Sequence, residues 1–299
     1  MDETVARAVA ILRAGGVIAL PTETVYGLAA DAANAAAVAR IYAIKGRPAD
    51  HPLILHLADA SWLARYTRTA DDRAATLAHA FWPGPLTMIV AKSDAVGAFV
   101  TGGQETVALR VPHHPVALAI LAAFGGALAA PSANRFGRVS PTRAEHVAQD
   151  LGADVDLIVD GGPARVGVES TIVDLTGEVP QIVRAGAIGP SDLGAALGVA
   201  VVTAAGGSVR APGTLASHYA PRARLILASD PAAEVQRRVA AGERAGILTL
   251  PADPAAAARD LYATLRALDA QGYDAIVTAL PPDTEANAAV RDRLTRAAH

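Results

Sequence analysis

The side chains that could carry chemistry in this sequence are mainly hydroxyl and cationic groups, gathered in four loops near short apolar segments. Loops that follow the strands of an open α/β sheet commonly hold its ligand site. Hydroxyl and cationic groups bind anions and stabilise charge that develops in a transition state. We therefore expect a site that gathers anionic reactants and needs no nucleophile from the protein.

The first loop is PTETVYGLAADA, residues 21–32, which begins at a proline that ends an apolar strand. Thr22, Glu23 and Thr24 follow this proline and are candidates to face a small ligand. The alternative is a capped turn, in which a threonine or the glutamate caps a helix.

The second loop is KGRPADHPLILHL, residues 45–57. Lys45 and Arg47 lie two residues apart in a Gly/Pro turn, where an ammonium and a planar guanidinium can meet one polyanion. The alternative is a pair of solvated surface charges. Lysine is rare in this chain, which favours a functional Lys45. His51 and His56 follow, and His56 in LILHL is either a sheet-face residue or a ligand contact.

The third segment, TVALRVPHHP, places Arg110 in an otherwise apolar strand. A buried charge needs a partner, which is either a structural ion pair or an anionic ligand. The fourth loop, APSANRFGRVSPT, follows an apolar strand. Its hydroxyls, amide and backbone N–H groups can hold phosphate oxygens, although a plain Ser/Asn turn has the same composition. The side chains of interest in this loop are Ser132, Asn134, Arg135, Arg138 and Ser140.

Several chemistries find no support in the sequence. The chain has no cysteine, no G-x-x-x-x-G-K-[ST] loop, no G-x-S-x-G, no H-E-x-x-H and no G-x-G-x-x-G after a strand. Paired carboxylates at catalytic spacing are not evident, which gives no support for glycoside hydrolysis. The net charge of −3 argues against a broad basic surface for nucleic acid.

The elements that must position these loops mix helices and strands, which predicts an α/β protein. Hydrophobic periodicity predicts helices at 3–14, 34–44, 71–80, 115–123 and 142–149. Short apolar runs predict strands at 17–20, 53–57, 86–91, 106–111, 127–130, 156–159, 171–175 and 181–184.

The last third of the chain differs from the rest in composition and in the order of its predicted elements. Residues 206–223 are rich in Gly, Pro and Ser and predict a linker between a domain at 1–205 and a second at 224–299. The second domain alternates strands and helices and predicts a small doubly wound, Rossmann-like domain with a parallel sheet. No uncharged apolar stretch is long enough to span a membrane, and the amino terminus is acidic where a secretion signal is basic. We expect a cytoplasmic protein.

Six ordered blocks resemble the YrdC-type domain of threonylcarbamoyl-AMP synthases: PTETVYGLAADA, KGRPADHPLILHL, FWPGPLT, TVALRVP, PSANRFGRVSPT and GVESTIVDLT. The hallmark pair of that family, K-x-R with S-x-N, is matched by Lys45/Arg47 and Ser132/Asn134. The linker APGTLASHYAP and the carboxy-terminal series resemble the longer, two-domain form. The resemblance implies an open, twisted α/β sheet around a deep basic cavity.

The resemblance also implies a reaction. The family joins L-threonine, bicarbonate and ATP into threonylcarbamoyl-AMP and releases pyrophosphate. Other proteins then transfer the threonylcarbamoyl group to an adenosine beside the tRNA anticodon. By this resemblance we expect Mg²⁺ with the ATP, no organic cofactor, no stable direct binding of nucleic acid, and downstream tRNA-modifying proteins as partners.

Residue roles follow from the resemblance, position by position. L-Threonine would be surrounded by Thr24, His56, Arg110, Ala130 and Ser170, with Arg110 on its carboxylate and Ala130 offering only its backbone. ATP and its phosphates would be held by Lys45, Arg47, His51, Thr106, Ser132, Asn134, Ser140 and Arg184. Lys45, Arg47, Ser132 and Asn134 would carry the catalysis. His218 and Tyr219 of the linker would close over the cavity, and Ala216 stands where some members have a tyrosine.

Two other functions compete with this one. YrdC-type domains also occur in carbamoyl-phosphate-dependent carbamoyltransferases, but those carry acylphosphatase and zinc-finger modules, which this cysteine-free chain lacks. A non-catalytic RNA-binding module would need an aromatic stacking platform, and aromatic residues make up only 4% of this chain.

Overall fold

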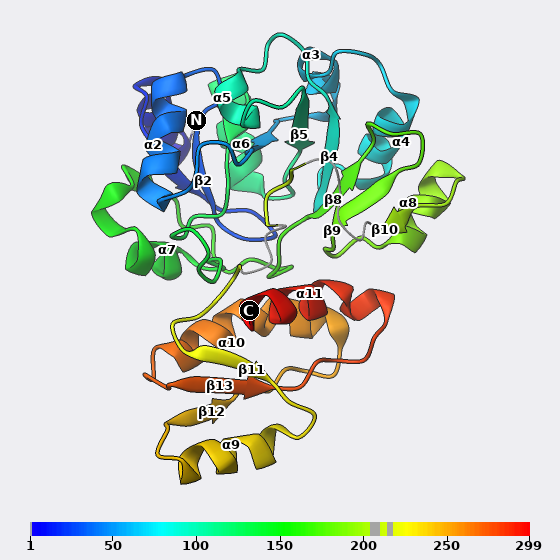
Figure 1. The fold of residues 1–299 in the computed structure, drawn as a ribbon. Helices are drawn as coiled ribbons and strands as arrows, with labels where there is room; N and C mark the ends of the chain where they lie inside the picture. Colours follow the sequence, from blue (N-terminus) through cyan, green and yellow to red (C-terminus); the bar gives the residue numbers. More distant parts are fainter. Residues whose placement is uncertain (1, 204–209, 214–217) are drawn as a thin grey trace.

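The computed structural model describes residues 2–203, 210–213 and 218–299, which form two α/β units stacked on one another (Figure 1). The first unit holds a ten-stranded sheet in the order β10-β9-β8-β4-β5-β3-β6-β2-β1-β7. The second holds a three-stranded sheet in the order β11-β13-β12. The mixed α/β fold with a large open sheet and a smaller carboxy-terminal domain confirms the predicted fold class.

The strands of the large sheet are short and run in both directions. Their bounds are β1 Ile18–Leu20, β2 Gly27–Asp31, β3 Ile54–His56, β4 Leu86–Ala91, β5 Thr106–Arg110, β6 Leu128–Ala129, β7 Leu157–Ile158, β8 Thr171–Asp174, β9 Gln181–Arg184 and β10 Val202–Thr203. The helices of this unit are α1 Glu3–Arg13, α2 Ala35–Lys45, α3 Leu63–Tyr66, α4 Asp72–Phe81, α5 Ala98–Thr101, α6 Pro115–Phe124, α7 Ala144–Asp150 and α8 Pro190–Leu197. Short 3-10 turns lie at Ala60–Trp62 and Gly152–Asp154.

Helices cover both faces of the sheet at its β1–β2–β6 end. α1 and α6 pack on one face in a cluster that includes Leu12, Ile18 and Leu128. α2 packs on the other face, where its apolar residues join the largest core cluster. α1 begins at the N-cap Asp2, whose carboxylate accepts from the Thr4 amide, and its buried residues recur at helical spacing.

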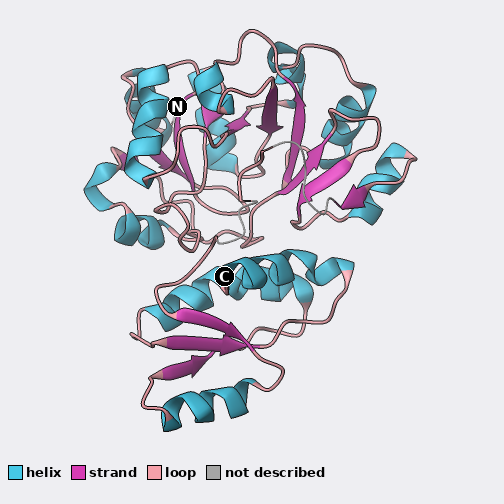
Figure 2. Ribbon diagram, in the orientation of Figure 1, coloured by secondary structure: helices cyan, strands magenta, loops and turns pink. Residues whose placement is uncertain are grey.

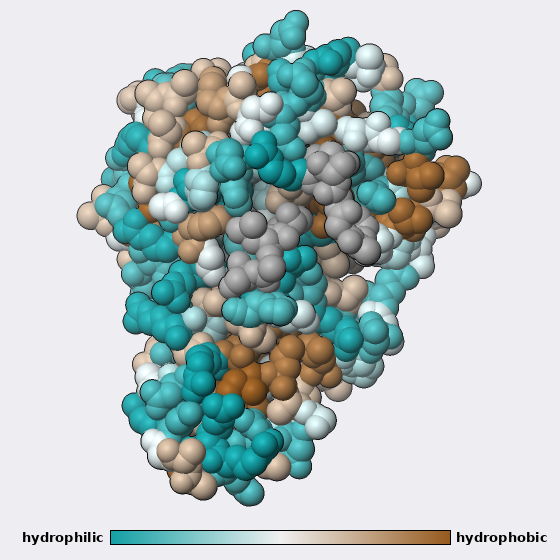
Figure 3. Space-filling view, viewed as in Figure 1, coloured by the Kyte–Doolittle hydropathy of each residue, from teal (hydrophilic) through white to brown (hydrophobic). Residues whose placement is uncertain are grey.

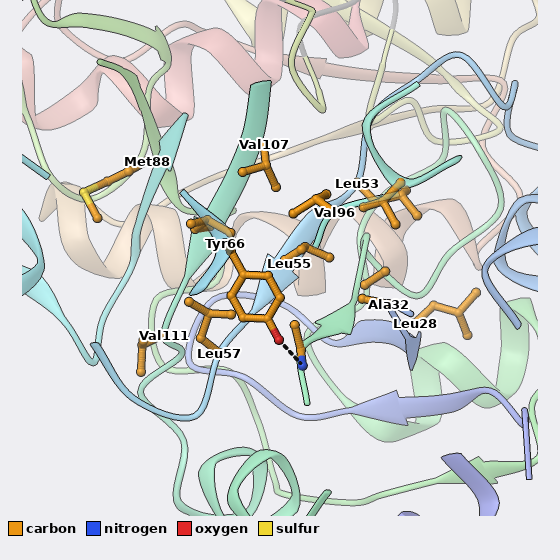
Figure 4. Packing of buried hydrophobic residues seen from close by; sticks show 14 of the residues in the cluster. Leu28, Ala32, Leu53, Leu55, Leu57, Tyr66, Met88, Val96, Val107 and Val111 are labelled. Carbon is orange, nitrogen blue, oxygen red and sulfur yellow. Dashed lines mark hydrogen bonds between the residues drawn. The ribbon is translucent and has the colours of Figure 1, made fainter. Parts of the chain in front are cut away.

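The middle of the sheet is covered differently on its two faces. Alternate residues of β3, β5 and their flanks point into the large core, where Leu53, Leu55, Leu57, Val107 and Val111 pack together (Figure 4). Tyr66 closes this core and accepts the Ala127 amide on its hydroxyl at 3.1 Å. The opposite face of the same strands leaves room for a site.

The carboxy-terminal unit follows the predicted alternation of strand and helix. Its elements are β11 Arg224–Leu227, α9 Pro231–Ala240, β12 Ala245–Ile247, α10 Pro254–Asp269, β13 Ala275–Thr278, a 3-10 turn at Glu285–Asn287 and α11 Ala288–Ala297. All three strands are parallel. α9 lies on one face, and α10 and α11 lie on the other, between the two sheets (Figure 2).

The two units share an apolar contact. Val25, Val139 and Val168 of the first unit belong to the same cluster as Leu261 and Leu294 of α10 and α11. The backbone of α10 approaches so closely that a Cβ on Gly167 would lie 2.3 Å from Cα of Arg259. The domain limits 1–205, 206–223 and 224–299 stay a prediction, because residues 204–209 and 214–217 are outside the described part.

Five helices and strands were not expected from the sequence: β2, α3, α5, α8 and β10. Residues 21–32 were interpreted as one loop, but their second half is β2, which pairs with both β1 and β6. Apolar surface gathers beside α8 and β10, where Val179, Val199 and Val202 are exposed (Figure 3). Within the described residues, no helix is long and apolar enough to cross a membrane.

Candidate active site

The two-residue alternation of paired strands brings His56 and Arg110 together. β3 and β5 are parallel, with His56 opposite Arg110 in the register. Leu55 and Leu109, the residues directly before them, point into the core. Because side chains alternate along a strand, His56 and Arg110 point to the opposite face. Both are almost completely buried, at 3% and 4% exposure. The histidine in LILHL is therefore a sheet-face residue that lines a cavity.

Two loops form the neighbouring wall. The loop after β1 is held by Thr22, whose hydroxyl donates to the Val25 carbonyl at 2.6 Å and lies 2.9 Å from the Thr24 hydroxyl. The loop after β6 runs beside it through an antiparallel bridge between Gly27 and Ser132. A Cβ on Gly27 would lie only 3.3 Å from Cβ of Ala130, so the two loops approach closely.

These segments enclose a cavity together with residues 212–213 and 218–219. Ten predicted site residues line it: Thr24, Arg47, His56, Arg110, Ala130, Ser132, Ser170, Arg184, His218 and Tyr219. Thr22, a candidate from the first loop, also lines it, and the structure adds seven others: Val25, Gly27, Ile54, Pro131, Glu169, Pro212 and Gly213. Whether each residue binds the ligand expected for it stays a prediction.

The cavity concentrates buried polar atoms that have no hydrogen-bond partner in the described part of the chain. They include Nε of Arg47, Nδ1 of His56, Nδ1 of His218 and the hydroxyl of Tyr219. Such atoms are rare in folded proteins because an unmet hydrogen bond is costly. Their convergence on one cavity indicates a site built to bind a polar ligand.

Burial controls the ionisation of the groups around the cavity. Desolvation, with help from Arg110, lowers the pKa of His56 to about 3. Desolvation likewise lowers the pKa of His218 to about 3 and that of Arg47 to about 10. At neutral pH the two histidines are uncharged, and the positive charge comes from arginines.

The Arg110 guanidinium has one acidic neighbour. Its Nη2 lies 2.8 Å from Oε1 of Glu23, and both side chains are nearly inaccessible to solvent. Its Nε donates to the Gly84 carbonyl at 3.2 Å. Arg110 therefore forms an internal ion pair and also lines the cavity, and its contact with an anionic ligand stays a prediction.

Arg184 is fixed by the strand next to it. β9 runs antiparallel to β8 and places Arg184 opposite Ile172, from where its side chain reaches Ser170, the residue before β8. Nη2 of Arg184 donates to the carbonyl and the hydroxyl oxygen of Ser170 at 2.9 and 3.0 Å. Its Nη1 donates to the Pro212 carbonyl at 3.0 Å. Arg184 thus connects the sheet to the segment after residue 209.

Five predicted site residues lie near the cavity or beyond it without lining it: Lys45, His51, Thr106, Asn134 and Ser140. Lys45 donates to the carbonyls of Ser132 and Asn134 at 2.5 and 2.6 Å, so it holds the loop after β6. Burial and the nearby Arg47 charge lower its pKa well below the usual value. Thr106 shares the face of Arg110 but begins β5, about 13 Å away along the strand.

Glu169 is a cavity residue that the sequence interpretation did not assign. It precedes β8 beside Ser170 and is 6% exposed. Its carboxylate accepts from Ser140, Tyr262 and Arg293 at 2.5, 2.8 and 2.8 Å. Burial alone raises its pKa, but the charges of Arg293 and Arg184 and the Ser140 hydrogen bond outweigh burial and bring it to about 2.

The linker contributes two aromatic side chains to the cavity wall. His218 and Tyr219 are buried, with ring centroids 4.2 Å apart. The His218 ring also meets Phe136 edge-on at 5.7 Å. Ala216, where some members of the resembling family have a tyrosine, lies outside the described residues.

The fold and the cavity define a class of protein: a YrdC-type α/β domain joined to a small doubly wound domain. The Sua5/YciO/YrdC family model, described as telomere recombination, matches residues 10–186. A second model, the carboxy-terminal domain of threonylcarbamoyl-AMP synthase, matches residues 182–299.

Individual relatives agree with these matches over nearly the whole chain. The threonylcarbamoyl-AMP synthase of Bacillus subtilis (strain 168) is 41% identical, covering 99% of this chain and 93% of the relative. That of Pyrococcus abyssi is 38% identical, covering 97% and 92%. A crystal structure of P. abyssi Sua5 complexed with L-threonine superimposes with a TM-score of 0.91 at 36% identity, covering 98% of this chain and 94% of the other. This chain belongs to the two-domain threonylcarbamoyl-AMP synthase family.

Proposed function

We propose that this chain condenses L-threonine, bicarbonate and ATP into threonylcarbamoyl-AMP and pyrophosphate in the cavity described above. The observation that carries the proposal is the convergence of Arg47, Arg110 and Arg184 on one buried cavity with unmet hydrogen-bonding groups. The full-length relatives that bear the synthase name support the same reaction.

The chemistry proposed for this cavity needs orientation and charge stabilisation more than a nucleophile. The amine of threonine attacks bicarbonate and expels water, which gives an N-carboxylate. One oxygen of that carboxylate attacks the α-phosphate of ATP, and pyrophosphate leaves. Holding three anions in one place and stabilising the leaving group can supply most of the rate enhancement.

The arginines divide naturally between the two larger substrates. Arg110 lies beside Thr24, His56 and Ser170, which are side chains that suit a small hydroxy amino acid, so we assign its guanidinium to the threonine carboxylate. Arg47 and Arg184 lie on the same cavity with Ser132 and are assigned to the phosphates. Lys45, Asn134 and Ser140 do not line the cavity. We assign them to holding the loop after β6, since each forms a hydrogen bond to another group of the protein.

Magnesium is expected to enter with ATP. Among the described residues, no group of three or more His, Cys, Asp or Glu side chains is placed to hold a metal ion. Glu169 is a carboxylate that lines the cavity, and it already accepts three hydrogen bonds from protein groups. We therefore propose that phosphate oxygens and water, rather than a protein cage, hold the ion, as Mg²⁺ commonly allows. The ion would neutralise phosphate charge there.

The product would serve tRNA modification through separate proteins that accept the threonylcarbamoyl group. The absence of stable direct tRNA binding, the absence of an organic cofactor and the cytoplasmic location stay predictions. A filter-binding titration with tRNA, run beside an assay of pyrophosphate release, checks the first of these.

Mass spectrometry of the products tests the proposed function. The purified chain is incubated with ATP, L-threonine and ¹³C-bicarbonate, and each substrate is omitted in turn. We expect threonylcarbamoyl-AMP that carries the label, formed with pyrophosphate only when all three substrates are present. Pyrophosphate without labelled product, or labelled product only with added carbamoyl phosphate, would contradict the proposal.

A further inference from the structure

A buried arginine of the carboxy-terminal domain contacts the wall of the cavity. Arg293 lies on the inner face of α11 among Ala289, Val290, Leu294 and Ala297, and its side chain is 1% exposed. A guanidinium on an apolar helix face is costly unless it is paired. Its Nη1 pairs with Asp292 on the same helix at 2.5 Å, and its Nε donates to Oε2 of Glu169 in the other domain at 2.8 Å.

Arg293 also contacts the linker. Its guanidinium lies over the ring of Tyr219, 4.9 Å from the centroid, in the geometry of a cation–π contact. Tyr219 has a left-handed backbone, with φ of +64°, which is unfavourable for a residue with a side chain. Tyr262 of α10 stacks on the same ring at 5.9 Å. Two residues of the carboxy-terminal domain therefore hold a cavity-lining tyrosine in a strained conformation.

The same two residues fix the cavity carboxylate. Tyr262 donates to Oε2 of Glu169 at 2.8 Å, and Ser140 donates to Oε1 at 2.5 Å. All three donors are buried, and Arg293 is anchored further by a 3.0 Å bond from Nη2 to the Ala185 carbonyl. Glu169 cannot leave its place in the cavity wall without breaking these bonds, and two of the three come from the carboxy-terminal domain.

We propose that Arg293 and Tyr262 are positioning residues for the synthase reaction, through which the carboxy-terminal domain fixes Glu169 and Tyr219 in the wall of the cavity. This inference rests on the proposed function. It gives the carboxy-terminal domain a part in catalysis without placing any of its own side chains on a substrate.

The test measures pyrophosphate release by full-length variants. Tyr262→Phe removes one donor to Glu169 and keeps the ring that stacks on Tyr219. Arg293→Lys keeps the charge and loses the planar group that spans two partners. The matched control is Glu285→Gln, which weakens another contact between the domains, the 2.6 Å bond from the Ser191 hydroxyl, away from the cavity.

We expect kcat/KM for ATP to fall about 3–10-fold in Tyr262→Phe and about 10–100-fold in Arg293→Lys, corresponding to one hydrogen bond and to a hydrogen-bonded charge. The control should keep its activity within about twofold. A double-mutant cycle with Glu169→Gln separates positioning from general destabilisation. If Arg293 acts through Glu169, the double variant loses less than the product of the two single losses.

Three outcomes overturn the inference: losses that multiply in the cycle, a Tyr262→Phe variant with wild-type kinetics, or a control that loses as much as the test variants. If Arg293→Lys does not fold, the cycle is made with Tyr262→Phe and decides in the same way. A wild-type protein that forms no threonylcarbamoyl-AMP contradicts the proposed function itself, which distinguishes that failure from a failure of the positioning role.

Discussion

Two buried ion pairs lie at this cavity, and they differ in how completely their atoms are bonded. Around Glu169 the carboxylate accepts from three donors, and Arg293 reaches a backbone carbonyl as well. Around Arg110 the only carboxylate within ion-pair distance among the described residues is Glu23, and neighbouring His56 has a ring nitrogen without a partner in that same part of the chain.

This difference indicates which of the two ion pairs is suited to bind a substrate. In the Glu169–Arg293 cluster the carboxylate already accepts three hydrogen bonds, so we expect its main effect to be to fix geometry. In the Arg110 cluster some polar atoms have no hydrogen-bond partner within the described residues. A buried polar atom without a partner costs free energy, which a bound ligand can recover by pairing with it. We therefore expect the Arg110 side to bind substrate and the Glu169 side to position the wall around it.

The largest expected effect comes from removing a cation that lines the cavity. Arg47→Ala should lower the rate of pyrophosphate formation by about 10²–10³, because a group that stabilises developing charge is lost. Steady-state assays of pyrophosphate release check this, with circular dichroism to confirm folding.

The control for Arg47 is Arg68→Ala, an exposed arginine paired with Glu105. It should change neither activity nor stability appreciably, because exposed ion pairs contribute little. Near-normal turnover of Arg47→Ala would contradict the role assigned to Arg47 in holding the phosphates. It would also contradict the assignment of the incompletely bonded side of the cavity to substrate binding.

A smaller and more selective effect is expected at Arg110. Arg110→Lys keeps the charge beside Glu23 but loses the two-pronged donor, so the KM for threonine should rise about 10–100-fold. The KM for ATP should change much less. Initial rates measured across both substrate concentrations separate the two constants.

Arg73→Lys is the matched control, since Arg73 is a partly buried arginine paired with Asp71 away from the cavity. Its threonine KM should equal that of the wild type. An Arg110→Lys variant that raises both KM values equally would show that Arg110 does not select threonine.

The smallest expected effect is on stability against pH. The pKa of His56 is about 3 in the folded protein, below the ordinary value of 6.5, because burial disfavours its charged form. Below about pH 6.5 the imidazole of His56 is therefore protonated in the unfolded chain but stays neutral in the folded chain. The free energy of unfolding falls as the pH falls. This residue accounts for a loss of about 2 kcal/mol at pH 5.

Urea unfolding of His56→Gln at about pH 7.5 and pH 5 measures this contribution. The stability lost between the two pH values should be about 2 kcal/mol smaller than in the wild type. The exposed His113→Gln serves as the control and should behave as the wild type. Equal losses in all three proteins would show that His56 is charged or solvated in the folded state.

Much of the part of the cavity around Arg110 was predictable, because the sequence patterns that indicate it lie within short segments of the chain. The strands at 53–57 and 106–111 are short apolar runs, and a charge in such a run needs a partner. Arg110 was therefore a candidate from the sequence alone. β2 was not recognised because Gly27–Asp31 consists mostly of small residues beside a polar loop, and its strand conformation depends on pairing with β1 and β6.

The positioning side was not predictable from local patterns. Glu169 meets Tyr262 and Arg293 across 93 and 124 residues of sequence. Only tertiary packing brings these side chains together. One signal was available: Arg293 occupies the apolar face of a predicted helix, where a charge indicates a buried partner.

A crystal structure of the full-length chain with L-threonine and a non-hydrolysable ATP analogue would show whether the Arg110 side binds substrate and the Glu169 side positions the wall. We expect the threonine carboxylate to contact Arg110, the phosphates to contact Arg47 and Arg184, and Glu169 to keep its bonds to Tyr262 and Arg293. Threonine bound away from Arg110, or a Glu169 that releases both partners to contact the ligands, would contradict this assignment.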